Sequence, residues 1–147
     1  MIVQRNNELL PCVFQFLQIL AQRVKKLFSS IANKFYPLLL LYLSNSDQRY
    51  INECHCLLKQ MVYVCNDSPQ FLLAILPVVK SAKKGDVIIS CIIDYLHFIS
   101  YYKEAVLLEM KDVVIEILQQ VKAKCLKEEK SQVKHLSQKY FSNSMNE

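Results

Sequence analysis

The feature that most constrains the fold of this chain is a pattern that recurs at a spacing of about forty residues. Each copy has an apolar stretch, a short polar turn and a second helical stretch. The apolar stretches are Phe35–Leu41, Ile75–Val79 and Val113–Leu118, and the turns are Ser44–Asp47, Lys83–Asp86 and Lys127–Ser131. Because hairpins of this size bury their apolar faces against one another, the recurrence predicts stacked helical hairpins and a partner-binding surface rather than a catalytic pocket.

Composition supports an all-α fold. The chain has 147 residues, of which 52% are hydrophobic, and Gly85 is its only glycine. A β-rich protein needs glycines at turns and bulges, so this composition favours helices throughout. The length is typical of one domain. We therefore predict an all-α solenoid of about three helical hairpins plus a leading helix.

The expected boundaries follow the apolar periodicity. Residues 1–30 form a leading helix or half-repeat that ends near Ser29 and Ser30, and residues 143–147 form a frayed tail. The three hairpins are predicted at 31–66, 68–102 and 103–142, and the first half of the last one reads as a single long amphipathic helix up to Cys125. The β-branched stretch Val87–Tyr101 has local strand character, but its length and its place in the repeat favour a buried helix.

The turns carry helix-start signals. Asp47 and Asp86 stand where an N-cap is expected, and Ser68 with Pro69 marks the start of another helix. Gly85 suits the left-handed backbone position that often ends a helix.

These features resemble the HEAT repeat. The resemblance covers residues 31–142 and lies in Pro37 and Pro77 of the first helices, in Asp47 and Asp86 of the turns, and in the apolar positions that follow. The third unit departs from the pattern, because it has no proline and Lys130 or Ser131 stands in place of the aspartate. The resemblance implies a right-handed α-solenoid and a non-enzymatic role as a protein-binding scaffold.

Within that class, the chain is similar to part of a tubulin-binding TOG domain of the CLASP type. The similarity lies in the short turn Ser44–Asp47, in the pair Lys83 and Lys84, and in the closing segment Ser131–Phe141. The chain has no tryptophan, which TOG domains carry in an early turn, and it has fewer repeats. In TOG domains the turns contact the acidic surface of tubulin, and the resemblance implies that role here for Asn45, Lys83, Lys84, Lys127 and Lys130.

Two clusters suggest a metal site, and neither has the required geometry. On a helix, Cys54, His55 and Cys56 point in different directions and do not converge on one ion. Cys91, Asp94 and His97 step round their helix, so no more than two of them face one point. The six cysteines (Cys12, Cys54, Cys56, Cys65, Cys91 and Cys125) fall in apolar helical patterns and are expected to be reduced and buried. We expect no metal, no cofactor and no enzymatic activity.

The net charge of +5 leaves several partner classes open. The first is an acidic protein held by lysine-bearing turns, of which tubulin is one example. The second is nucleic acid along the same basic rim, which the modest charge excess disfavours. The third is incorporation into a larger helical complex, for which an apolar patch on the first or last layer would be the sign. No membrane segment is expected, and the cysteine usage favours a cytoplasmic or cytoskeletal location, with the nucleus as the alternative.

Overall fold

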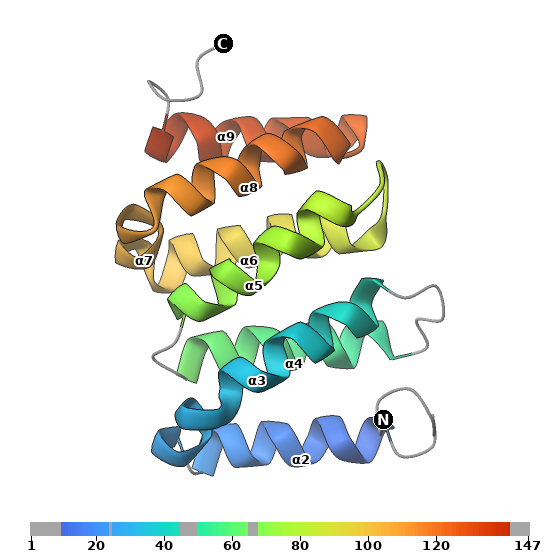
Figure 1. Ribbon diagram of the computed structural model, residues 1–147, viewed down its shortest axis with the longest axis vertical. Helices are drawn as coiled ribbons and strands as arrows, with labels where there is room; N and C mark the ends of the chain where they lie inside the picture. The colour runs from blue at the N-terminus through green and yellow to red at the C-terminus, as the bar shows by residue number, and fades with distance from the viewer. Residues whose placement is uncertain (1–9, 24, 45–49, 65–67, 142–147) are drawn as a thin grey trace. The chain divides into compact units, whose positions relative to one another are not determined.

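The structure is a computed structural model that describes residues 10–23, 25–44, 50–64 and 68–141. The helices, shown in Figure 1, are α2 (Leu10–Arg23), α3 (Lys25–Ser44), α4 (Ile51–Val64), α5 (Ser68–Ser81), α6 (Val87–Tyr102), α7 (Glu104–Glu109), α8 (Lys111–Lys124), the 3-10 turn η1 (Lys127–Glu129) and α9 (Lys130–Phe141). Within these ranges no residue lies in a β-strand, so the prediction of an all-α fold is confirmed. No helix in the same ranges is long and apolar enough to cross a membrane.

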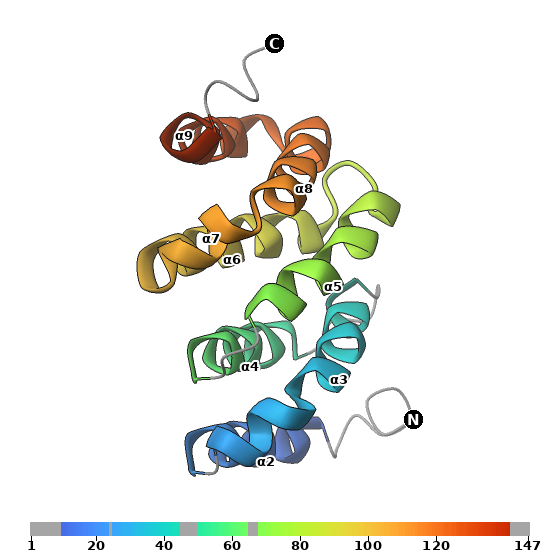
Figure 2. The same ribbon diagram turned by 60° about the vertical axis from the view of Figure 1, so that its left-hand side comes forward.

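The chain divides into two compact units, Met1–Phe71 and Leu72–Glu147, called here the N-terminal and C-terminal units. In the N-terminal unit, α2 and α4 lie side by side, and α3 crosses them on one side (Figure 2). Aromatic side chains pack between these helices and against Phe71 of α5. The rings of Phe14 and Tyr42 meet edge to face with centroids 5.8 Å apart, and those of Tyr36 and Phe71 lie 5.0 Å apart.

Buried aliphatic residues of α6 form the centre of the C-terminal unit. Helices α6 and α9 lie on one side of this unit, and α5 and α8 lie on the other (Figure 2). Ile92, Leu96 and Ile99 of α6 are buried, as are Ile117 and Val121 of α8. The stretch with local strand character is therefore a helix, because apolar surface on nearly every side of it is covered by neighbouring helices.

The helix boundary near residues 29 and 30 differs from the prediction. The expected break at Ser29 and Ser30 is wrong, because α2 ends at Arg23 and α3 then runs from Lys25 through both serines to Ser44. Serine is an acceptable helix residue, and the chain around the pair remains apolar at helical spacing. Pro37 and Pro77 lie inside α3 and α5 and do not begin them.

The long helix predicted to end at Cys125 is divided. Helix α7 ends at Glu109, Met110 has φ −102° and ψ 33°, and α8 begins at Lys111. A hydrogen bond from the Met110 N–H to the Val106 carbonyl, 3.0 Å long, completes α7. The apolar spacing continues across the break, so the periodicity of the sequence does not reveal it.

Candidate functional site

Two lysine-bearing turns of the C-terminal unit lie side by side (Figure 1). One joins α5 to α6 through Lys83–Asp86, and the other joins α8 to α9 through η1. The Gly85 N–H donates a hydrogen bond of 2.9 Å to the Lys124 carbonyl, which links the two turns. Gly85 has φ +83°, as predicted for the left-handed position, and this conformation directs its N–H toward α8.

A carboxylate closes each turn in the same way. The Lys83 N–H donates to Asp86 Oδ2 at 2.8 Å, and the Leu126 N–H donates to Glu129 Oε1 at 3.0 Å. The Ser90 hydroxyl of α6 donates to the other Glu129 oxygen, so Glu129 also connects the turns. The predicted N-cap role of Asp86 is therefore only half right. Asp86 occupies the N-cap position of α6, but its carboxylate bonds back to Lys83 and makes no side-chain cap bond.

Lys124 holds the end of α5 against α8. Its ammonium group donates to the Val79 and Lys80 carbonyls at 2.7 Å and 2.8 Å. A cation is favourable there because the last carbonyls of a helix are unpaired and carry partial negative charge. The Lys80 ammonium in turn lies 2.7 Å from Glu116 Oε1 of α8. These contacts fix the position from which the Lys83–Asp86 turn begins.

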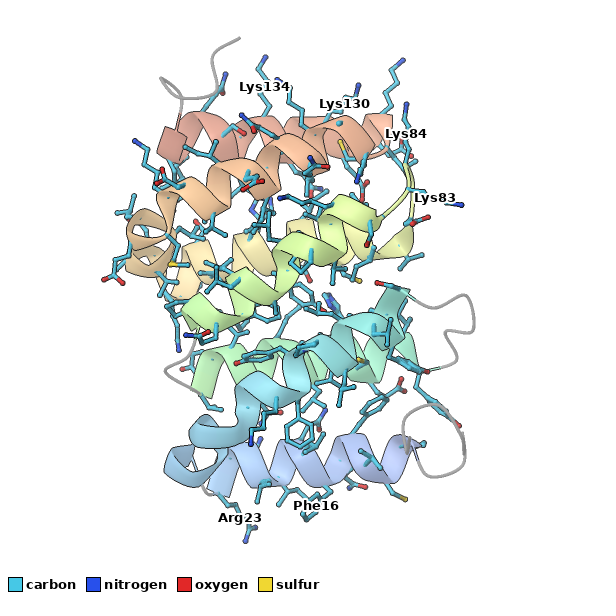
Figure 3. The ribbon with its side chains drawn as sticks, viewed as in Figure 1. Phe16, Arg23, Lys83, Lys84, Lys130 and Lys134 are labelled. Atoms are coloured by element: carbon cyan, nitrogen blue, oxygen red, sulfur yellow. The ribbon has the colours of Figure 1, made fainter. Side chains whose placement is uncertain are left out.

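The structure brings together four of the five predicted binding residues. Lys83, Lys84, Lys127 and Lys130 are exposed on the two linked turns and are called here the lysine edge. Figure 3 shows Lys83, Lys84, Lys130 and Lys134 following one another from the first turn along α9. Lys134 is exposed one helical turn after Lys130, and the repeat comparison missed it because it lies beyond the turn. Asn45 and Asp47 lie outside the described residues.

Charged residues near the two turns affect the pKa of the Cys125 thiol. Burial raises the pKa of the Cys125 thiol, and the Glu129 carboxylate acts in the same direction, while Lys130 and Lys84 oppose both. The raised pKa keeps this cysteine in its unreactive thiol form.

The cysteines differ in part from the prediction. Cys54, Cys91 and Cys125 are buried, as expected, but Cys12 and Cys56 are exposed. Cys65 lies outside the described residues. His55 is half-buried. Among the described residues, no group of three or more His, Cys, Asp or Glu side chains could hold a metal ion.

A second polar cluster joins α6, α7 and α9. The Tyr140 hydroxyl of α9 lies 2.9 Å from Glu104 Oε2 and also contacts the Ser100 hydroxyl of α6. Nearby, the His97 Nε2 atom is buried and has no hydrogen-bond partner among the described residues. Burial lowers the pKa of His97, and the charges of His135 and Lys139 lower it further, against the opposing effect of Asp94. Burial and the positive charges near it therefore favour the neutral form of His97.

We expect acid to weaken the C-terminal unit through His97. Because its folded pKa lies below the unfolded value of about 6.5, the unfolded chain binds the proton more readily, and stability falls as the pH drops through that range. Thermal unfolding at about pH 7.5 and about pH 5.5 measures the loss. His97→Gln should show a smaller loss, whereas an equal loss in both proteins would refute the assignment.

In comparisons with protein families, curated proteins and solved structures, no match is found for this chain. The candidate site therefore rests on its own residues, which are four exposed lysines on two turns held together by Gly85, Lys124 and Glu129.

Proposed function

We propose that this chain is a non-enzymatic scaffold that binds an acidic protein through the lysine edge. The observation that carries the proposal is the bond between Gly85 and Lys124, since it joins two turns that are distant in sequence. The exposed lysines of both turns then act together on one partner. Charge complementarity of this kind steers association and selects the partner.

The two turns also carry three carboxylates, those of Asp86, Glu128 and Glu129, which offset part of the charge of the four lysines. Asp86 accepts a hydrogen bond from the Lys83 N–H, and Glu129 accepts bonds from the Leu126 N–H and the Ser90 hydroxyl. These bonds hold both carboxylates against the backbone while the lysine side chains extend into solvent. The edge is therefore ordered in its backbone and cationic at its surface.

The arrangement of the helices supports the α-solenoid proposed from the repeats. Within each unit the longer helices alternate between two sides, as they do in HEAT-like hairpins, and the short helix α7 lies on the same side as α6 (Figure 2). Tubulin is the acidic partner implied by the resemblance to TOG domains, and it is the natural first protein to test. Its acidic surface has the charge that the lysine edge requires.

Nucleic acid fits the edge less well. Phosphate is recognised best by the planar fork of arginine, which makes two parallel hydrogen bonds. The three arginines of the chain, Arg5, Arg23 and Arg49, all precede residue 50, so the lysine edge has none. Lysine ammonium groups, which are compact and carried on flexible side chains, can pair with the carboxylates of an acidic protein segment.

The test is the affinity of the full chain for tubulin before and after Lys83→Glu combined with Lys84→Glu. We expect binding to weaken about tenfold, and more at low salt, because two attractive charges become repulsive. Lys34→Glu combined with Lys111→Glu is the matched control, since both lysines are exposed and the net charge changes equally. Equal affinities for the two double variants would contradict the role of the edge.

A second candidate function is incorporation into a larger helical complex. It is favoured by α2 of the N-terminal unit, where Phe16 is 61% exposed and Ile19 is 46% exposed. Cys12 is exposed on the same helical face, because the three positions are four and three residues apart. This function predicts that a partner covers α2 and leaves the lysine edge free.

A further inference from the structure

Two exposed apolar side chains lie next to the lysine edge in the sequence. Val87, the first residue of α6, is 46% exposed, and Leu126, which precedes η1, is 41% exposed. Val87 follows Asp86, which closes the first turn, and Leu126 lies between Lys124 and Lys127. Single exposed aliphatic side chains are common on protein surfaces, and what distinguishes this pair is its place beside two lysine-bearing turns, as at the centre of an interface.

Both side chains occupy defined positions. A Cβ atom added to Gly85 would lie 3.4 Å from Leu126 Cδ2, so Leu126 lies in van der Waals range of the first turn. The Leu126 N–H donates a hydrogen bond to the Glu129 carboxylate, which also accepts one from the Ser90 hydroxyl. Ser90 is one helical turn after Val87 and faces the same side of α6. Leu126 therefore lies against the first turn, and Val87 lies on the face of α6 that Glu129 contacts through Ser90.

This arrangement restricts the chemistry of the partner. A chain with only acidic side chains would pair with the lysines but leave Val87 and Leu126 uncovered. A segment with an apolar side chain between carboxylates would satisfy both parts of the surface. An anionic membrane is less suitable, because stable attachment to a bilayer requires a larger apolar face than two half-exposed aliphatic side chains.

We propose that the lysine edge recognises an acidic protein segment that carries a central apolar side chain, with Val87 and Leu126 receiving that side chain. The inference rests on the proposed function, because the lysines must first bind an acidic partner. The lysines supply attraction and the aliphatic pair supplies selectivity among acidic segments. Leu126 is the main selective residue, since it lies where the two turns meet.

The experiment uses two glutamate-rich peptides of equal length and charge, one with a central leucine and one with serine in its place. Isothermal titration with the full chain is expected to show about fivefold tighter binding of the leucine peptide, since burial of apolar surface favours association. Leu126→Ser should bind both peptides with equal affinity, close to that of the wild type for the serine peptide. Lys83→Glu combined with Lys84→Glu should lower the affinity for both peptides by the same factor.

The outcomes separate the two proposals. Equal affinity of the wild type for the two peptides would overturn the apolar selectivity and leave the acid-binding edge standing. Absence of salt-sensitive binding to either peptide would overturn both. A third outcome would assign the surface to a membrane. In it the chain binds phosphatidylcholine–phosphatidylserine vesicles, Leu126→Ser abolishes that binding, and the two peptides bind with equal affinity. If Leu126→Ser does not fold, two conservative variants replace it. Leu126→Met should keep the preference for the leucine peptide, and Val87→Thr should reduce that preference.

Discussion

Replacing Leu118 with alanine is expected to lower the free energy of unfolding by about 2–5 kcal/mol. Leu118 is buried on α8 and faces a closely packed apolar centre to which α6, α7 and α9 also contribute. Its neighbours there are Leu96, Leu107, Val114, Leu136 and Tyr140. Truncation removes buried methyl groups and leaves a space that four helices cannot all close.

Denaturant titration followed by circular dichroism measures this effect, with Leu108→Ala as the matched control. Leu108 of α7 is a leucine of the same unit that is 52% exposed, so its truncation should change the free energy by less than about 0.5 kcal/mol. Leu118→Met, which nearly conserves volume, should cost less than about 1.5 kcal/mol. If the two alanine variants were equally stable, the packing described for the C-terminal unit would be wrong.

Replacing Lys124 with methionine is expected to destabilise the C-terminal unit by about 1–2 kcal/mol, because the Val79 and Lys80 carbonyls lose a charged hydrogen-bond donor at the end of α5. Methionine keeps most of the apolar stem, so the change isolates the ammonium group. Lys122→Met is the control, because Lys122 is exposed on the same helix and loses the same charge.

The same variant should loosen the lysine edge. Hydrogen exchange of the Gly85 amide, which bonds to the Lys124 carbonyl, is expected to become faster in Lys124→Met than in Lys122→Met. Equal stability and equal exchange in the two variants would mean that the α5 contact does not order the edge.

Much of the fold could be predicted because local preferences and the apolar period agree. A single glycine and a three-four apolar spacing favour helices along the chain, and the burial of α6 explains why its β-branched residues do not form a strand. Side-chain polarity misleads at two positions. The polar pair Ser29 and Ser30 suggests a break where α3 is continuous, and Met110, a good helix former, gives no sign of the boundary between α7 and α8.

The candidate site was only partly visible in the sequence. The repeat places Lys83, Lys84, Lys127 and Lys130 in equivalent turns, and the structure brings these turns together. The contributions of Lys124, Val87 and Leu126 depend on contacts between residues that are far apart in the chain, and no local pattern encodes such contacts. The bond between Asp86 and Lys83 was missed because N-cap statistics do not distinguish a carboxylate that bonds forward from one that bonds backward.

Amide chemical-shift mapping tests the account most directly, because it separates the lysine edge from the exposed face of α2. The leucine-containing acidic peptide is titrated into the isotope-labelled full chain, and the two-dimensional amide spectrum is recorded at each step. We predict that residues 83–87 and 126–134 show the largest shifts. Large shifts around Cys12, Phe16 and Ile19, with residues 83–87 and 126–134 unchanged, would contradict binding at the lysine edge.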